Sequence, residues 1–369
     1  MGTYFIATSW GSTAISQQFM TLSHELVVRG HRVVILVDGQ KKDVEHHEGN
    51  PAIYTWPSKR PTHARDAIFL SRLLKHYRPD CLIANFGAAN IMMLVGWLLR
   101  VPGRISWYHT LSTAIDLDAK LPRWKIRLLR LRKRLVYQAT THIVANSIAA
   151  CDDAQRVFRV PRSKCQVFYN SLSDPLHKNE ICEHIKREPG KILCVGRLYP
   201  TKGQDILIKA LPYIAKTFPQ LSVEFVGDGP SRSELVRLAN ELGVGHMCKF
   251  TDQIRHEEVL SKMATSEITI VPSRSDAFGL VNIESLAVGT PVIASAVGGI
   301  VEIVRDGVDG YMFPSEDSAA LGSKICVLMS SPELKRVMGS NARENFLRNF
   351  ETGVIVDNLI KWLERITSC

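Results

Sequence analysis

Short runs of hydrophobic residues alternate along the chain with longer stretches in which hydrophobic and polar residues recur at helical spacing. Uninterrupted apolar runs of about four to eight residues are typical of strands buried on both faces of a parallel sheet. Alternating strands and helices predict an α/β fold with two doubly wound, Rossmann-like domains. The predicted strands are residues 4–8, 32–37, 80–85, 104–108, 142–145, 165–169, 192–195, 223–226, 248–251, 268–271 and 291–294.

A polar stretch separates the two predicted domains. We expect a first domain over residues 1–170, a linker over residues 171–190 and a second domain over residues 191–351. A last amphipathic helix over residues 352–369 follows the second domain. With 369 residues, 45% of them hydrophobic, the chain is long enough and apolar enough to bury two cores.

The most informative stretch lies in the second half, where a short helix over about residues 280–288 connects two predicted strands. Gly279 opens this helix, and Gly289 closes it as a left-handed C-cap would. The backbone N–H groups of Phe278, Gly279 and Leu280 therefore lack partners within the helix and point out of its start. A helix start at the carboxyl edge of a parallel sheet is suited to binding an anion such as phosphate.

Two carboxylates flank this predicted anion site. Asp276 stands just before the start of the short helix, and Glu284 stands one turn inside it. The plain alternative is that Asp276 caps the helix and that Glu284 is a solvated helix residue. A bulky residue such as Phe278 next to Gly279 has no role in capping a helix. Its presence therefore favours a binding site over a simple helix cap.

A second anion-binding signature follows an earlier strand. After the apolar run 192–195, Gly196 allows a close backbone turn, and Arg197 and Lys202 lie on either side of that turn, ahead of a helix. Arg offers a forked pair of donors and Lys a point charge, and the two together suit a diphosphate. Taken by itself, this segment could equally be a solvated turn. Together with the helix start at Gly279, it predicts one phosphate-binding crevice.

These segments resemble the carboxyl-terminal half of the retaining nucleotide-sugar glycosyltransferases of the GT-B fold, family four, the glycosyl transferases of group 1. The likeness covers about half of the chain closely and the amino-terminal half more loosely. One departure is that the family usually has Glu where this chain has Asp276. The matching positions are the acidic pair Asp276 and Glu284, the Gly-Arg…Lys-Gly element of Gly196, Arg197, Lys202 and Gly203, the strand 291–295, the turn Gly298-Gly299, Glu302, and Asp306-Gly307 with Gly310.

The resemblance implies two Rossmann-like domains that face a deep crevice, with the final helix returning to the first domain. It implies a metal-independent transferase that moves a hexose-type sugar from a nucleotide diphosphate-sugar, UDP-sugar favoured, to an acceptor hydroxyl with retention of configuration. The acceptor would belong to glycan, polysaccharide or glycolipid assembly. The nucleotide-sugar is then a co-substrate, and neither a cofactor nor a metal is expected.

The resemblance also implies roles for individual residues. The turn of Gly196, Arg197 and Lys202 and the helix start at residues 278–280 would stabilise the departing diphosphate.

Glu284 would accept hydrogen bonds from ribose hydroxyls, Asp276 would orient the sugar ring, and backbone near Ile254 would hold the base. Two other functions stay open. One is a sugar-nucleotide epimerase of the same fold, for which we find no convincing acid and base. The other is an inactive nucleotide-sugar-binding partner subunit, which only the Asp at position 276 supports.

The first half of the chain begins as a βαβ unit with a loop of small residues after its first strand. Only Gly11 stands where a dinucleotide fingerprint needs glycines, so that fingerprint is excluded. The resemblance implies that Gly11 and Ser12 face the crevice and help to seat phosphate or acceptor; a plain tight turn is the alternative. His109 follows another strand, at the sheet edge where ligands bind. The resemblance implies that it contacts the donor sugar or the acceptor, although a single His is more often structural.

Asp116 and Asp118 form a two-acid motif that metal-dependent transferases of another fold use. Here the two acids follow no predicted strand and precede a basic helix. We interpret the motif as a coincidence.

The basic excess of the chain lies entirely in its first half. Residues 1–175 contain 24 Lys and Arg against 12 Asp and Glu, a net +12 within a whole-chain charge of +10. Residues 120–135 contain eight of these cations and no acid, and leucines with Trp124 recur there at helical spacing. Such a helix either packs its apolar stripe on the sheet or lies on an anionic membrane surface. Nucleic acid is a third partner class, but no recognition module supports it.

No run of residues is long and uncharged enough to span a bilayer, and the amino terminus lacks the features of a signal peptide. The eight cysteines form no close pairs, which favours reduced thiols over a disulfide framework or a zinc site. We therefore expect a cytoplasmic protein, peripheral on the inner face of the membrane if residues 120–135 bind lipid. The expected partners are the nucleotide-sugar donor, a glycan or lipid-linked acceptor and that anionic surface, but no nucleic acid.

Overall fold

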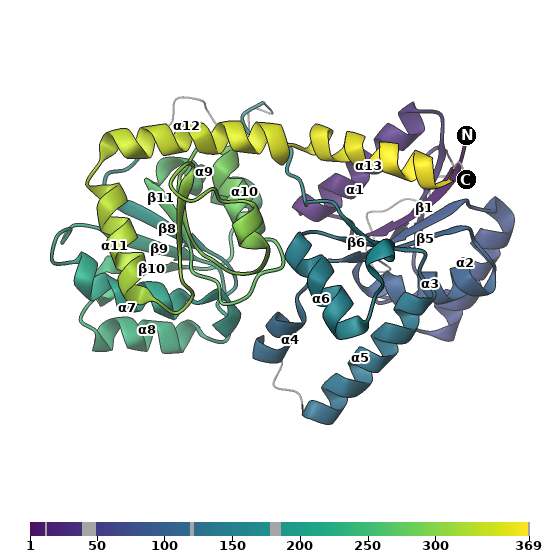
Figure 1. The fold of residues 1–369 in the computed structure, drawn as a ribbon, viewed down its shortest axis with the longest axis horizontal. Helices are drawn as coiled ribbons and strands as arrows, with labels where there is room; N and C mark the ends of the chain where they lie inside the picture. Colours follow the sequence, from purple (N-terminus) through teal and green to yellow (C-terminus); the bar gives the residue numbers. More distant parts are fainter. Residues whose placement is uncertain (12, 39–48, 119–121, 178–185, 368–369) are drawn as a thin grey trace. The chain divides into compact units, whose positions relative to one another are not determined.

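The computed structural model describes residues 1–11, 13–38, 49–118, 122–177 and 186–367 (Figure 1). The chain forms two compact units. Unit 1 consists of Met1–His109, Leu121–Ser173 and Thr352–Cys369, and unit 2 consists of Thr110–Lys120 and Asp174–Glu351.

Unit 1 is built on a parallel sheet whose seven described strands have the order β3-β2-β1-β4-β5-β6-β7. Because successive side chains of a strand point to opposite faces, Tyr4 and Ile6 of β1 enter one core while Phe5 and Ala7 enter another. The strands are β1 (Thr3–Thr8), β2 (Arg32–Val37), β3 (Ala52–Thr55), β4 (Cys81–Ala84), β5 (Gly103–Tyr108), β6 (His142–Ala145) and β7 (Cys165–Val167).

Helices cover both faces of this sheet. α1 and α13 pack against each other over the core of Tyr4 and Ile6, whereas α2, α3 and the end of α5 pack over the core of Phe5 and Ala7. A hydrogen bond of 3.0 Å between the hydroxyls of Tyr4 and Thr367 ties the end of α13 to β1. The helices of unit 1 are α1 (Ala14–Val28), α2 (Ala64–Tyr77), α3 (Ala89–Leu98), α5 (Arg123–Gln138), α6 (Ile148–Phe158) and α13 (Thr352–Thr367), with 3₁₀ turns at Phe86–Ala88 and Arg162–Lys164.

Unit 2 contains a second parallel sheet, with six described strands in the order β10-β9-β8-β11-β12-β13. α7, α8 and α11 pack on one face, and α9, α10 and α12 pack on the other (Figure 1). The strands are β8 (Lys191–Val195), β9 (Ser222–Val226), β10 (Cys248–Thr251), β11 (Ile268–Val271), β12 (Val292–Ser295) and β13 (Gly310–Phe313). The helices are α4 (Ser112–Asp118), α7 (Gln204–Ile214), α8 (Arg232–Glu241), α9 (His256–Thr265), α10 (Leu280–Ala287), α11 (Ser318–Met329) and α12 (Pro332–Asn349), with 3₁₀ turns η3 (Pro200–Lys202), η4 (Gly245–Met247) and η5 (Gly298–Glu302).

Two parallel sheets, each with helices on both faces, confirm the predicted fold class of two Rossmann-like domains. Both sheets begin with the 3-2-1-4-5-6 strand order of doubly wound folds. Among the described helices, none combines the length and the apolar character that a membrane crossing requires.

One segment differs from the expected division of the chain. α4 groups with unit 2, although the sequence assigned it to the first domain. The physical reason is that α4 is a seven-residue helix whose polar side chains bind loops of unit 2, so no apolar pattern signals its partner. Most of the expected linker, residues 178–185, lies outside the described residues.

Candidate active site

The two predicted anion-binding segments follow neighbouring strands in unit 2. β8 and β11 lie side by side where the strand order reverses, with Ile192 opposite Ile268. In doubly wound sheets, ligands bind beyond the carboxyl ends of the strands at this reversal. The loop with Arg197 and Lys202 follows β8, and the loop with Asp276 follows β11. The structure therefore brings together the two segments that the sequence assigned to phosphate binding.

An ion pair joins these two loops. Nζ of Lys202 donates a hydrogen bond of 2.6 Å to Oδ2 of Asp276, and 24% of the Lys202 side chain and 15% of the Asp276 side chain are exposed. Oδ1 of Asp276 accepts a hydrogen bond of 3.3 Å from the backbone N–H of Phe278. Asp276 is therefore not the N-cap of α10, a position that Gly279 occupies. The pair is accessible to a ligand, yet buried enough for its charges to interact strongly with one.

The close approach of the loops requires glycine at two positions. Gly203, directly after Lys202, has a φ of +64°, and a Cβ atom there would collide with the carbonyl oxygen of Pro272. Gly298 has a φ of +51°, and a Cβ atom there would collide with the carbonyl oxygen of Asp276. A larger residue at either position would displace a loop that carries one partner of the ion pair.

Arg197 stacks on an aromatic ring of its own loop. Its side chain is exposed, and its Cζ lies 4.9 Å from the centre of the Tyr199 ring, a cation–π contact. The side-chain amide of Gln204 donates a hydrogen bond of 3.1 Å to the carbonyl oxygen of Arg197 and so fixes the backbone. Gly196, with a φ of +151°, supplies the turn that directly follows β8. The guanidinium is thus held beside the carboxyl end of β8 and open to solvent.

The start of α10 has no side-chain cap, because its N-cap residue is Gly279, with a φ of 90°. The side chain of Phe278 is buried and packs on Phe350, with ring centres 6.1 Å apart, so it anchors the loop in the core. The N–H of Phe278 has no partner within α10, but it donates to the side chain of Asp276, which precedes the helix. Leu280 is half-buried and begins the helix.

Glu284 is buried within α10 with 8% of its surface exposed, so it is not a solvated helix residue. Its Oε1 lies 3.0 Å from Nε2 of His256, the first residue of α9. A buried carboxylate needs hydrogen-bond partners, and His256 holds this one in place. Sequence reasoning missed His256. The available signal was its position directly after the loop of Ile254, which was expected to hold a nucleotide base.

α4 supports both loops of the ion pair. Thr201, next to Lys202, donates its hydroxyl to Oδ2 of Asp118 over 2.9 Å and its backbone N–H to Oδ1 over 3.4 Å. The hydroxyls of Thr113 and Ser275 lie 2.8 Å apart. Asp118 therefore positions the loop of Lys202.

Arg274 connects the same loops from another side. Its guanidinium makes two hydrogen bonds of 2.7 and 2.8 Å to the carboxylate of Asp205 and also pairs with Glu316. Its backbone N–H donates to the carbonyl oxygen of Thr201 over 2.8 Å. Burial alone would raise the pKa of Asp205, but hydrogen bonds from Arg274 and Lys209 lower it to about 2. Arg274 is a positioning residue that sequence reasoning did not find.

Unit 1 places His109 at the carboxyl end of β5 and half-buries it. Nε2 of His109 lies 2.7 Å from Oδ1 of Asn85, a buried residue that follows β4. Burial, together with the smaller effect of the Lys133 charge, lowers the pKa of His109 to about 3, so the imidazole is neutral at neutral pH. Gly11 lies in the exposed loop after β1, and Ser12 lies outside the described residues.

Two family models match the chain. The model for glycosyl transferases group 1 matches residues 179–345, and the model for glycosyltransferase family 4 matches residues 15–173. A GDP-mannose-dependent alpha-(1-6)-phosphatidylinositol monomannoside mannosyltransferase of Mycolicibacterium smegmatis is 34% identical over 167 residues, which are 43% of this chain and 44% of that relative. D-inositol 3-phosphate glycosyltransferases of several bacteria also match. The matches cover 34% to 65% of the relatives' length, so this chain spans less than two thirds of each.

Solved structures share the fold over the whole chain. Sucrose-phosphate synthase of Thermosynechococcus elongatus has a TM-score of 0.77 at 20% identity, with 100% of both chains covered. Anabaena HepE in complex with UDP-glucose has a TM-score of 0.72 at 18% identity, with 99% of this chain and 100% of HepE covered. Since the two family models together match most of the sequence, the chain belongs to the group 1 glycosyl transferases, glycosyltransferase family 4, with the GT-B architecture.

Proposed function

We propose that the protein transfers a hexose-type sugar from a nucleotide diphosphate-sugar to an acceptor hydroxyl with retention of anomeric configuration. The observation that carries this proposal is the contact between Lys202 and Asp276 beside the strand reversal of unit 2. A cation for the diphosphate and a carboxylate for the sugar hydroxyls then lie next to each other. This matches the donor, in which the sugar is bonded directly to the diphosphate.

In the proposed reaction, the bond between the anomeric carbon and the diphosphate oxygen breaks while a bond to the acceptor oxygen forms. Arg197, Lys202 and the start of α10 stabilise the negative charge that develops on the diphosphate. The departing phosphate takes the acceptor's proton on the same face of the sugar. The two cations supply the positive charge that a divalent metal would otherwise bring, so we propose a metal-independent reaction.

Glu284 suits the ribose of the donor. A buried carboxylate that His256 holds in one orientation presents its remaining lone pairs to two neighbouring hydroxyls. Asp276, nearer the phosphate cation, suits the transferred sugar. We therefore expect Glu284→Ala to weaken binding of the free nucleotide diphosphate in calorimetry, and Asp276→Ala to lower turnover with little change in that binding.

The proposal leaves a choice between uridine and guanosine as the nucleoside of the donor. We favour a UDP-sugar; the HepE complex holds UDP-glucose, whereas the relative from M. smegmatis is described as GDP-mannose-dependent. Incubation with UDP-glucose, UDP-N-acetylglucosamine and GDP-mannose, with and without EDTA, tests the proposal through release of nucleotide diphosphate. Release from one donor that EDTA does not affect is the expected result. An isomerised sugar would identify an epimerase, and binding without release would identify an inactive partner subunit.

We further propose that the acceptor belongs to glycan, polysaccharide or glycolipid assembly. We also propose that the protein lies peripherally on the inner face of a membrane, where it meets this acceptor. The net charge of +12 over residues 1–175 supports this place of action.

A further inference from the structure

The apolar stripe of α5 is exposed rather than packed on the sheet. Among the described side chains of the helix, those that reach the protein interior lie in its second half: Lys133, whose Nζ lies 4.8 Å from the centre of the Tyr108 ring, and Val136 and Tyr137, which the buried Ala139 follows. Soluble proteins rarely leave such a stripe uncovered unless something binds it. The exposed fractions are 62% for Trp124, 60% for Leu128, 55% for Leu131 and 55% for Leu135.

α3 extends this apolar surface. The helix packs against α5 in unit 1 (Figure 1). Its last turn exposes 56% of Trp97 and 68% of Leu98. Two neighbouring helices thus each expose a tryptophan among leucines, and we call the surface formed by α3 and α5 the α3/α5 surface.

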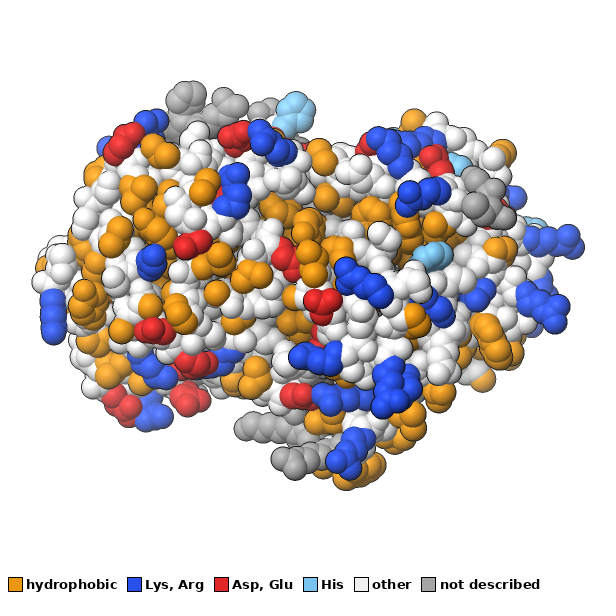
Figure 2. All heavy atoms as spheres, viewed as in Figure 1, with side chains coloured by type: hydrophobic (Ala, Val, Ile, Leu, Met, Phe, Trp, Pro, Cys, Tyr) orange, Lys and Arg blue, Asp and Glu red, His pale blue; other side chains and the backbone are white. Residues whose placement is uncertain are grey.

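Cations accompany the apolar side chains of the α3/α5 surface. Seven of the 16 residues of α5 are Lys or Arg, and none is acidic. Lys125, Arg127 and Arg132 are exposed, and within the described part of the chain the structure pairs none of them with an acid. Figure 2 shows Lys and Arg side chains next to hydrophobic ones on this side of unit 1. The surface is therefore apolar and positively charged at once.

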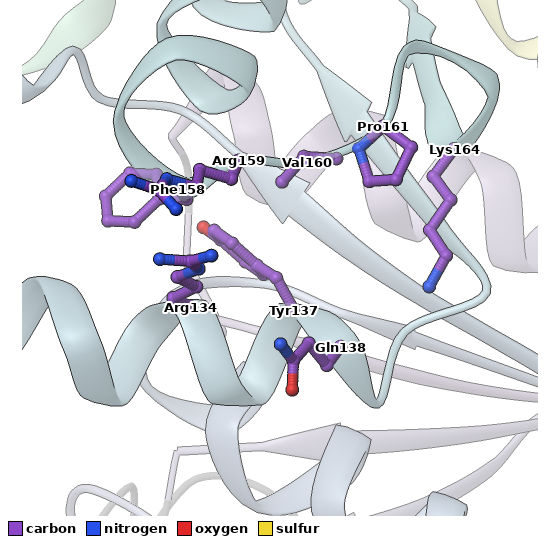
Figure 3. A pocket seen from close by; sticks show the side chains of 8 residues that line it. All are labelled: Arg134, Tyr137, Gln138, Phe158, Arg159, Val160, Pro161 and Lys164. Carbon is purple, nitrogen blue, oxygen red and sulfur yellow. The ribbon is translucent and has the colours of Figure 1, made fainter.

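A basic pocket lies at the end of α5. Its volume is about 250 Å³, and no acidic residue lines it. Arg134 and Tyr137 from α5 and Arg159 from the end of α6 point to one end of the pocket, and Lys164 lies at the other (Figure 3). Forked guanidinium groups with a nearby hydroxyl suit a phosphate group.

We propose that the α3/α5 surface docks on a bilayer of anionic phospholipid, with the phosphate of one lipid headgroup in the pocket of Arg134 and Arg159. Tryptophan and leucine on a cationic helix are typical of helices that lie in the membrane interface. Several cations close to an anionic leaflet attract it over about one Debye length, so docking is reversible and salt-dependent.

Two other occupants fit the surface less well. A second copy of the chain would bring two acid-free cationic helices together, which opposes association. A nucleic acid would leave the exposed leucines and both tryptophans without an apolar partner. Docking itself rests on this surface alone, whereas a membrane-proximal acceptor also rests on the proposed function.

Vesicle co-sedimentation of the full chain tests the proposal, with phosphatidylcholine vesicles that contain or lack phosphatidylglycerol. We expect binding that requires phosphatidylglycerol and falls with added salt. The apolar variant Trp124→Ser/Leu128→Ser/Leu131→Ser and the charge variant Lys125→Glu/Arg127→Glu/Arg132→Glu should each lower the fraction bound at least about tenfold. The control Lys59→Glu/Arg60→Glu/Lys216→Glu makes the same change of net charge at exposed sites outside α5 and should bind like wild type.

The pocket has its own test. Arg134→Gln/Arg159→Gln should weaken vesicle binding several-fold, and wild type should prefer phosphatidylglycerol vesicles to inorganic phosphate at equal phosphate concentration. Saturable binding of inorganic phosphate by a protein that ignores the vesicles would make the pocket a free-anion site and overturn the proposal. A wild-type dimer that the apolar variant converts to monomer in sedimentation velocity, without vesicle binding, would overturn it in favour of a second copy.

Failure of docking is separable from failure of the proposed function. Release of nucleotide diphosphate is measured on the same preparations without vesicles, and the docking variants should retain it. Absence of vesicle binding by wild type with intact release refutes the docking proposal and the peripheral membrane location proposed above, but leaves the proposed reaction untouched. Vesicle binding without release from any donor refutes only the proposed reaction.

Discussion

Lys202 and Asp276 neutralise each other in the structure, and a nucleotide diphosphate-sugar would offer each a better partner. Only 24% of the Lys202 side chain and 15% of the Asp276 side chain are exposed, so each charge needs a partner, and the diphosphate and the sugar hydroxyls of the donor can replace the one it has. The ion pair mainly fixes positions. It holds the ammonium group of Lys202 and the carboxylate of Asp276 side by side, where one would bind the diphosphate and the other the transferred sugar. The glycines at positions 203 and 298 make that approach sterically possible.

Replacing Lys202 by Ala should lower turnover by about two orders of magnitude, because one preorganised donor to the developing phosphate charge is lost. Arg197→Ala should have an effect of similar size for the same reason. Both residues lie on an accessible turn, so the melting temperature should change little. Steady-state kinetics with the donor that wild type accepts measures this, with Lys216→Ala as an exposed control. A near-normal rate in either variant would remove that residue from the proposed reaction.

His109 should make the protein less stable in mild acid. Its folded-state pKa of about 3 lies below the unfolded value of about 6.5, so the unfolded chain binds the proton first. Stability is therefore lost as pH falls from about 6.5 towards 3, and this residue accounts for about 2 kcal/mol between pH 7 and pH 5. His109→Gln, which keeps a polar partner for Asn85, should lose that much less in urea unfolding at the two pH values. Equal losses in both proteins would show that His109 titrates normally.

Among the secondary-structure elements, the buried ones were predictable and the surface ones were not. β2, β6 and β11 have the predicted bounds, because strands whose residues are mostly buried leave an apolar run in the sequence. The left-handed Gly289 also ends α10 as predicted. In α5 the spacing identified the residues that share a face, but no pattern within a helix tells whether protein, lipid or water covers that face.

In the candidate site, local sequence motifs were predictable, whereas contacts between residues far apart in the sequence were not. The glycine and cation spacing after β8 and the acids around α10 were visible in sequence, because these local patterns act through the backbone. His256 and Arg274 were missed, since their partners lie far along the chain, at Glu284 and Asp205. Asp118 was noticed but not explained, because its partner Thr201 is 83 residues away.

Asp118→Ala should loosen the turn that carries Lys202. The lost hydrogen bonds to Thr201 should cost about 1 kcal/mol of stability and lower turnover several-fold. Thr201→Val removes the hydroxyl partner, so the double variant should lose less than the sum of the two single losses. Melting curves and turnover of all four proteins give the coupling. Additive effects would mean that α4 does not position this turn.

At the scale of the whole molecule, the last helix of the chain, α13, completes the core of unit 1. α13 belongs to unit 1, yet residues 174–351 of unit 2 separate it in sequence from the rest of that unit. Its apolar face packs with α1 over the core of β1, and its buried residues include Val356, Leu359 and Leu363. Unit 1 therefore cannot complete its core until the last helix has been added.

Trp362→Ala tests this closure. Trp362 is 6% exposed and lies with its ring centre 5.4 Å from that of His142 in β6 and 5.4 Å from that of Phe168. Removing a buried tryptophan leaves a cavity and should cost about 3–5 kcal/mol of stability. Trp97→Ala removes the same side chain from an exposed position, where surface changes typically stay within about 0.5 kcal/mol.

Denaturant unfolding should therefore separate Trp362→Ala from Trp97→Ala by at least about 2 kcal/mol. Below the unfolding transition, calorimetry should find nucleotide affinity unchanged in both, because the residues expected to bind the ribose and the base, Glu284 and the backbone near Ile254, belong to unit 2. Equal stability of the two variants would mean that α13 adds no core to unit 1. A loss of nucleotide affinity in folded Trp362→Ala would mean that unit 2 depends on the same closure.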